Sequence, residues 1–384
     1  MKSQYFNAEH QLFRESLRQF FDKEVAPYAN EWEEKRQIPK DIMLKMGKQG
    51  YLGLNFPEQY GGSNADLWYS VVFLEELART GLAGFSTMVS VHQFMAINHI
   101  FKAGSAALKE KYLVPAIRGE KLAALGISEP AAGSDVSALL TKAERQGDSY
   151  LINGSKTFIS NGTYGDFITL ACKTSDTALS LIVVDLDAEG VSRTKLKKMG
   201  WHSSDTAEIS FDNVKVPLTN LIGKEGMGFY YLMESLQLER LVAAIMAVIG
   251  ATHTLDLTVK YLHERETFGK TLAKYQVIRH TLADLFTEVE MAKQMVYNTC
   301  WLFTQGETVV KECSMAKLYT SELANKVADK CLQYFGGYGY MEDFPICRIY
   351  RDVRVGTIAG GASEIMREII AKIAIDGVSF GKVY

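Results

Sequence analysis

The sequence predicts a mainly α-helical protein with a central β-domain. Two observations lead to this fold class: apolar residues recur at helical spacing towards both ends of the chain, and short β-rich runs separated by turn residues fill the middle. The length of 384 residues allows two or three domains. We therefore expect an N-terminal helical domain at residues 1–120, a middle β-domain at 121–226 and a C-terminal helical domain at 227–384.

Helical spacing begins near Ala8 and continues to about Gly119. Apolar side chains recur there at intervals of three and four, which places them on one face of a helix. The residues on the first such face are Phe13, Leu17, Phe20, Phe21 and Val25. Residues 67–78 and 88–101 show the same spacing, and Pro57 predicts a loop between helices together with the glycine pair at 61–62.

Between residues 121 and 226 the pattern changes to short β-rich runs. Asn153-Gly154 and Asn161-Gly162 predict turns between runs, because these residues tolerate positive φ. No crossover helix separates the runs, so antiparallel strands around a small β core are expected. Gly226-Met-Gly228 lacks the third glycine of a Rossmann turn, which argues against nicotinamide binding. Strands are predicted at residues 149–152, 157–160, 166–171, 179–184 and 207–211.

Long helices are predicted after Met227. One has a continuous apolar stripe made of Ile278, Leu282, Leu285, Val289 and Val296. Residues 314–335 and 346–375 predict two further helices, with a glycine-rich stretch between them. Four long apolar-striped helices with short connections indicate a helix bundle.

The composition excludes several classes of protein. The chain has 42 Lys and Arg against 45 Asp and Glu, whereas nucleic-acid binding needs clustered positive charge. No stretch approaches ~18 uninterrupted apolar residues, so no transmembrane helix is expected. The first residues lack the features of a secretory or transit signal, which predicts a cytoplasmic location. Five widely spaced cysteines indicate buried thiols in a reducing compartment, with no metal or dithiol site.

Four segments could carry chemistry, although each also has an ordinary structural explanation. Residues 126–135 (GISEPAAGSD) form either a polar loop or a segment whose backbone amides approach a phosphate or a flavin edge. Residues 153–162 (NGSKTFISNG) suit either a hairpin or a platform for a stacked ring. Residues 265–269 and 333–337 contain the cation and glycines that are common at helix ends.

Taken in order along the chain, six segments resemble the acyl-CoA dehydrogenase family. They are GISEPAAGSD, NGSKTFISNG, LERLVAA, RETFGKTLAKYQ, QYFGGYGY and residues 351–367. The resemblance extends from near Glu9 to the C-terminus, and its details look most like the long-chain and isovaleryl branches. It implies a middle β-barrel or sandwich and a C-terminal four-helix bundle, with FAD between them and across a subunit interface.

The resemblance also implies roles for individual residues. Positions that match the family's flavin contacts are Leu125, Ile127, Ser128, Gly133, Ser134, Phe158, Ser160, Ala362 and Glu364. Positions that match segments reaching the adenosine and pyrophosphate of FAD from a neighbouring subunit are Arg265, Phe268, Gln276, Gln333, Gly336 and Gly337. Positions that match acyl-CoA contacts are Ser134, Tyr230, Arg240, Gly360 and Gly361.

The catalytic base is where this chain departs from many family members. Removing the weakly acidic α-proton of a thioester needs a carboxylate in a dry pocket that raises its pKa. Many members place this glutamate in a Tyr-Glu-Gly-Thr run near the C-terminus. Here Gly360 occupies that position, and glycine cannot accept a proton.

The long-chain and isovaleryl branches place the base in a Leu-Glu-Arg run, which this chain has at Leu238-Glu239-Arg240. The apolar run that follows would desolvate the Glu239 carboxylate. A glutamate beside an arginine is usually a solvated ion pair. Because Gly360 cannot serve, Glu239 is nevertheless the expected base.

The resemblance implies FAD-dependent α,β-dehydrogenation of an acyl-CoA to trans-2-enoyl-CoA, in fatty-acid β-oxidation or branched-chain acyl-CoA degradation, with an electron-transfer flavoprotein as acceptor. The strings beginning at Trp201 and Gly361 favour a medium-to-long straight chain over an isovaleryl or short branched one. An acyl-CoA oxidase, a desulfinase-like relative and a non-catalytic flavin-binding relative are alternatives that the sequence favours less. The resemblance also implies a homotetramer, in which part of the 47% apolar content would serve subunit interfaces and an acyl tunnel besides the core.

Overall fold

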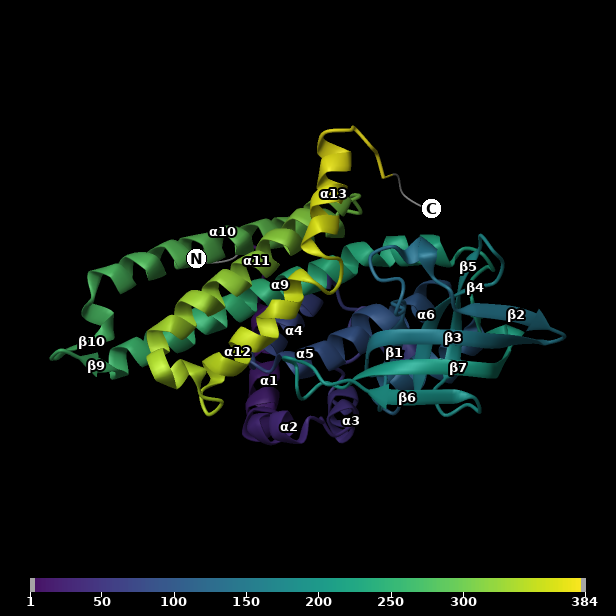
Figure 1. The fold of residues 1–384 in the computed structure, drawn as a ribbon, viewed down its shortest axis with the longest axis horizontal. Coiled ribbons are helices and arrows are strands. Elements are labelled where there is room, and N and C mark those ends of the chain that lie inside the picture. Colours follow the sequence, from purple (N-terminus) through teal and green to yellow (C-terminus); the bar gives the residue numbers. More distant parts are fainter. Residues whose placement is uncertain (1–3, 381–384) are drawn as a thin grey trace.

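The computed structural model describes residues 4–380, whose three zones follow one another along the chain (Figure 1). Residues 1–3 and 381–384, which belong to the expected first and last domains, lie outside the described residues. Helices fill the first zone, an eight-stranded sheet fills the second, and long helices return in the third. The predicted order of helical, β and helical zones is confirmed.

The N-terminal helices begin where the sequence supplies capping groups. The side chain of Asn7 accepts a hydrogen bond from the backbone N–H of His10, and that of Asp66 accepts one from Trp68. These bonds satisfy amides that a first helical turn leaves unpaired. The helices are α1 Ala8–Glu24, α2 Ala29–Lys35, α3 Asp41–Lys48, α4 Leu67–Arg79, α5 Ala83–Ser90, α6 Ile97–Ala103, α7 Ala106–Leu108 and α8 Val114–Ile117.

The helix predicted over residues 88–101 is continuous but not uniform. A π-helical turn, Val91–Ala96, joins α5 to α6. Such wide turns are rare and often occur at functional sites. This turn contacts both the first strand of the sheet and the first long helix of the C-terminal zone, so it lies where the three zones meet.

The middle zone forms one mixed sheet. Its strands are β1 Ala123–Gly126, β2 Lys142–Gln146, β3 Ser149–Ser160, β4 Phe167–Lys173, β5 Leu179–Asp185, β6 Val191–Lys195, β7 Thr206–Pro217 and β8 Leu221–Ile222. Their order is β6-β7-β3-β2-β4-β5-β8, with β1 paired to β4. Most neighbours are antiparallel as predicted, but β1 and β2 each run parallel to β4. Ile152 and Ile209 of the paired strands β3 and β7 share one core with Ile182 of β5, which lies three places away from β3 in this order, so the sheet curls around that core.

One predicted turn was wrong. Asn153-Gly154 lies inside the strand β3 and does not separate two strands. The pairing of β3 with β7 shifts register between Ile152 and Gly154, and the φ of Gly154 is +146°. The glycine therefore serves a β-bulge, which needs the same conformational freedom as a turn. Asn161, with a φ of +62°, lies in a turn directly after β3, as predicted.

The C-terminal zone is built on three long helices, α9 Gly228–Glu264, α10 Gln276–Thr304 and α11 Val310–Phe335. A short hairpin of β9 Glu266–Thr267 and β10 Lys270–Thr271 connects α9 to α10. The single helix predicted over residues 346–375 was wrong. It is divided into α12 Pro345–Val353 and α13 Ser363–Ala374 by a loop in which Gly360 and Gly361 both have positive φ.

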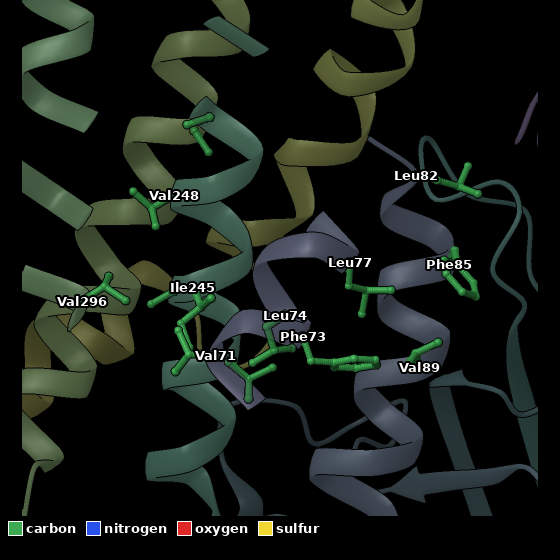
Figure 2. Packing of buried hydrophobic residues seen from close by; sticks show 14 of the residues in the cluster. Val71, Phe73, Leu74, Leu77, Leu82, Phe85, Val89, Ile245, Val248 and Val296 are labelled. Carbon is green, nitrogen blue, oxygen red and sulfur yellow. The ribbon is translucent and has the colours of Figure 1, made fainter. Parts of the chain in front are cut away.

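The N-terminal helices and the C-terminal bundle share one hydrophobic core. Val71 of α4 lies next to Ile245 of α9, while Phe73 points the other way, towards Val89 of α5 (Figure 2). Helix α9 is also the one helix in residues 4–380 that is long and apolar enough to cross a membrane, with a mean hydropathy of 1.6 over its most apolar stretch. Polar residues interrupt its sequence, which is why no transmembrane helix was expected from uninterrupted apolar runs. Its contacts with α4, α10 and α11 are those of a core helix.

Candidate active site

The carboxylate of Glu239 lies on α9 at the start of that helix's apolar run. Glu239 is 7% exposed, and its Oε1 has no hydrogen-bond partner among the described residues. Burial raises the pKa of Glu239 to about 7, and the positive charges of Arg240 and Lys102 offset only part of this effect. A carboxylate with a near-neutral pKa and a free oxygen is suited to accept a proton.

His99 of α6 faces this carboxylate. Its Nε2 lies 3.9 Å from Glu239 Oε1, and its Nδ1 lies 3.5 Å from Ser235 Oγ. The ring is 1% exposed, and burial lowers the pKa of His99 to about 4, so the imidazole is neutral at physiological pH. His99 could not be identified from the sequence, because its place beside Glu239 depends on the packing of α6 against α9.

Two predicted acyl-CoA contacts on α9 differ in exposure. Arg240 is 7% exposed, and its Nη1 donates a hydrogen bond to Ser314 Oγ of α11 at 3.3 Å. Tyr230 lies in the first turn of α9, where it is about half exposed and packs edge-on against Phe229. The structure therefore turns Arg240 towards the bundle and leaves Tyr230 at the surface.

Gly360 and Gly361 lie in the loop between α12 and α13. A Cβ added to Gly360 would meet no described atom within 4 Å, and the φ of Gly360 is +64°. The carbonyl of Gly361 accepts a hydrogen bond from Lys317, a buried lysine of α11. Burial and the charge of Arg240 lower the pKa of Lys317 to about 8. Because Lys317 and Ser314 share one face of α11, this helix links the Gly360 loop to Arg240, the neighbour of Glu239.

The loop after β1 is held in place by a buried ion pair. Lys156 Nζ lies 2.7 Å from Glu129 Oε1 and donates a hydrogen bond to the carbonyl of Ile127 at 2.9 Å. Glu129 also accepts two backbone N–H groups from the far end of the loop. Sequence reasoning missed this pair, although both residues stand inside the two motifs. The pair leaves Gly133 and Ser134 at the surface, where backbone amides can meet a ligand.

Phe158 lies directly beside this loop, because the N–H of Thr157 donates to the carbonyl of Ser128 at 2.9 Å. Phe158 is 72% exposed, has a φ of +61° and coincides with a register shift of β3 against β7. A left-handed backbone at an exposed aromatic residue is costly and is typical of functional sites. The exposed ring, with the small residues of the loop, fits a flat aromatic group such as the flavin of FAD. The other predicted flavin contacts of this zone are partly buried, namely Leu125, Ile127, Ser128 and Ser160.

The other predicted FAD contacts lie in the C-terminal zone. Ala362 is the N-cap of α13, and Glu364 is exposed in the first turn of that helix. The end of the bundle that carries the hairpin β9–β10 lies opposite the β-domain (Figure 1). The residues at that end are Arg265, Phe268, Gln276, Gln333, Gly336 and Gly337. One chain therefore does not bring these residues together with Phe158, and their contact with the FAD of a neighbouring subunit stays a prediction.

Three parts of the chain match family models. Residues 7–120, 124–214 and 226–375 match the N-terminal, middle and C-terminal domains of acyl-CoA dehydrogenase. The long-chain specific acyl-CoA dehydrogenase of Rattus norvegicus mitochondria is 38% identical over 374 residues, which are 96% of this chain and 86% of the relative. The chain belongs to the acyl-CoA dehydrogenase family.

Two further comparisons agree with this assignment. A crystal structure of acyl-CoA dehydrogenase from Geobacillus kaustophilus is 41% identical and superimposes with a TM-score of 0.94, covering 97% of this chain and 100% of that one. The caffeyl-CoA reductase-Etf complex subunit CarC of Acetobacterium woodii is 38% identical over 96% of this chain and 98% of its own length. This acyl-CoA dehydrogenase is a flavin-dependent oxidoreductase with FAD as cofactor and an acyl-CoA as substrate. The predicted family, fold and enzyme class are confirmed.

Proposed function

We propose that this acyl-CoA dehydrogenase uses Glu239 to remove the α-proton of a medium-to-long straight-chain acyl-CoA, which yields trans-2-enoyl-CoA. The observation that carries the proposal is the free Oε1 of a buried carboxylate whose pKa lies near 7. The position that carries the base in many family members also supports the proposal, because it is Gly360 in this chain and glycine has no side chain that could accept a proton. In residues 4–380 no other carboxylate combines the Leu-Glu-Arg sequence with this burial.

The chemistry that FAD supplies when bound is acceptance of a hydride from the β-carbon. The residues of the chain prepare the substrate for this step. Glu239 holds the α-proton on its carboxylate once it is removed, and its raised pKa makes that transfer less unfavourable. The exposed ring of Phe158, fixed by the bulge in β3, supports one side of the cofactor site. The shared core around α9 keeps the carboxylate away from bulk water.

We also propose a homotetramer in which the hairpin end of the bundle completes the FAD site of a neighbouring copy. Phe268 is 97% exposed at the tip of the hairpin, where it and Gly269 both have positive φ. A fully exposed phenylalanine on a tight turn is better explained by contact with another surface than by solvent. Static light scattering of the native enzyme tests this, because a monomeric mass would contradict the proposal.

An electron-transfer flavoprotein is the proposed acceptor of the electrons. The name of the Acetobacterium woodii relative places that protein in a complex with such a partner. Steady-state turnover that depends on added electron-transfer flavoprotein is the expected result. Equal turnover with oxygen alone would favour the oxidase alternative.

The central test is the variant Glu239→Gln, examined by anaerobic bleaching of the flavin. The amide keeps the shape of the side chain but cannot accept a proton, so the rate should fall by about a thousandfold while the FAD stays bound. Glu234→Gln is a matched control on the same helix, because Glu234 is partly exposed and paired with Lys102 at 2.9 Å. Its rate should stay near that of the wild type. Substantial bleaching by Glu239→Gln would move the base elsewhere.

The same assay determines which acyl chain length and branching the enzyme prefers. A ladder of straight acyl-CoAs from butyryl to palmitoyl, with isovaleryl-CoA beside them, should bleach the wild-type flavin fastest in the medium-to-long range. A response confined to isovaleryl-CoA would establish the branched-chain alternative. Protein that binds FAD but is bleached by none of these acyl-CoAs would establish the non-catalytic one.

A further inference from the structure

Two polar groups on one face of α9 enclose the imidazole of His99. Ser235 and Glu239 are four residues apart on the helix, so their side chains point the same way. The ring of His99 meets both, with Nδ1 at 3.5 Å from Ser235 Oγ and Nε2 at 3.9 Å from Glu239 Oε1. All three side chains are buried, and within residues 4–380 both His99 Nε2 and Glu239 Oε1 are without a hydrogen-bond partner.

We propose that His99 is a positioning residue for the base, with Ser235 donating to Nδ1 and the Nε2–H directed at the carboxylate of Glu239. This inference rests on the proposed role of Glu239. The arrangement follows from the geometry, because a ring lone pair at Nε2 would repel an ionised carboxylate, whereas an N–H attracts it. With the proton on Nε2, the ring nitrogen Nδ1 is unprotonated and can accept a hydrogen bond from a serine hydroxyl. This bond fixes the tautomer.

The neutral ring gives the carboxylate an orienting dipole without adding a charge. The N–H favours the ionised form of Glu239 and aims its free oxygen, which opposes the effect of burial on its pKa. The gap of 3.9 Å is too long for a hydrogen bond in the absence of substrate. Hydrogen bonds at catalytic sites commonly tighten when the substrate binds. The α-proton stays on Glu239 throughout, and His99 keeps its own proton.

The other charged groups around α9 either act on Glu239 or are engaged with partners of their own. Arg240 on the same helix and Lys102 on α6 both act on Glu239. Lys317 of α11 is engaged with the carbonyl of Gly361. On α4, Glu75 is paired with Arg14 and accepts a hydrogen bond from Tyr297 of α10. In contrast to these charged groups, His99 is neutral, and its Nε2 lies 3.9 Å from the free oxygen of Glu239.

The test measures how the rate of anaerobic flavin bleaching depends on pH in His99→Leu and His99→Gln. Loss of the donor in His99→Leu should move the acid limb of the profile to higher pH by about one unit. His99→Gln retains an N–H donor of similar reach and should restore the limb most of the way. Ser235→Ala removes the hydroxyl that fixes the tautomer of His99, so it should shift the acid limb by an intermediate amount. FAD content and the melting temperature show that each variant is folded.

His253→Leu is the control, because His253 lies on α9 beside Gly81, away from the base. It should leave the acid limb unchanged. A profile of His99→Leu that coincides with the wild type, or that moves to lower pH, would overturn the proposal. If His99→Leu fails to fold, the glutamine and alanine variants decide alone, and wild-type profiles in both would overturn it. The outcome is separable from that of Glu239→Gln, since an inactive Glu239→Gln with an unshifted His99→Leu removes only this inference.

Discussion

Two buried carboxylates, Glu239 and Asp352, differ in what surrounds them although burial raises the pKa of each to about 7. Both leave one oxygen without a partner among the described residues. The other oxygen of Asp352 accepts the backbone N–H of Trp201 at 2.6 Å, so this carboxylate ties α12 to a loop of the middle zone. Within residues 4–380 no backbone N–H donates to the carboxylate of Glu239, and its free oxygen faces His99.

The difference shows that a raised pKa does not by itself identify a base. Asp352 is flanked by Arg348 and Arg351, which act against the effect of burial, and by Glu33, which adds to it. These groups come from helices α2 and α12, so Asp352 belongs to a junction between zones. Glu239 instead precedes Arg240, which α11 links to the loop of Gly360, where the substrate contacts are predicted. Position relative to the substrate separates the two roles.

The largest expected effect comes from moving the base. In the double variant Glu239→Gln with Gly360→Glu, a carboxylate enters the open space beside Gly360. The backbone there has a φ of +64°, which costs a non-glycine residue about 1–2 kcal/mol. We expect anaerobic bleaching to recover by about tenfold or more over Glu239→Gln alone and to stay below the wild type.

The control for this transfer is Glu239→Gln with Gly360→Gln. It introduces the same bulk without a proton acceptor and should show no recovery. Equal rates in the two double variants would mean that the Gly360 loop does not face the reacting carbon, and the contrast between the two carboxylates would lose its explanation.

Much of the fold and part of the candidate site could be predicted from the sequence, and the features that could not be predicted have physical reasons. The helices α1, α4, α10 and α11 follow from apolar spacing, because one face of each is buried. The prediction of a turn at Asn153-Gly154 was wrong because a bulge inside a strand needs the same positive φ as a turn. The burial of Glu239 could be predicted because an apolar run follows it, whereas its role as the base stays a prediction that rests on the Leu-Glu-Arg motif. His99 and Asp352 could not be identified, since their roles depend on which distant helix or loop packs against them.

The second prediction concerns the pH dependence of the rate. The proposed base, Glu239, must be ionised to accept the α-proton, and its pKa is raised to about 7. The second-order rate constant for bleaching should therefore fall about tenfold for each pH unit below 7 and level off above it. Asp352→Asn should show the same profile, because Asp352 does not contact the reacting atoms. A profile that shifts in Asp352→Asn, or a flat one in the wild type, would contradict the separation of the two carboxylates.

Asp352→Asn is expected to have the smallest effect on the rate and to change the stability instead. The folded-state pKa of Asp352 lies above its ordinary value of 3.8, so the folded protein binds the extra proton. Stability is lost as the pH rises from about 4 to about 7, and the loss is complete above 7. Asparagine carries no charge and can still accept the N–H of Trp201, so it removes this loss.

The melting temperature of Asp352→Asn should therefore match the wild type near pH 4 and exceed it increasingly up to pH 7, with no further gain above. At about 1.4 kcal/mol for each pKa unit, the upper limit of the gain is about 4 kcal/mol. Thermal unfolding of both proteins across this pH range measures it. A variant less stable than the wild type at pH 8 would show that the ionised Asp352 is compensated by Arg348 and Arg351, and that the two buried carboxylates differ in charge state as well as in position.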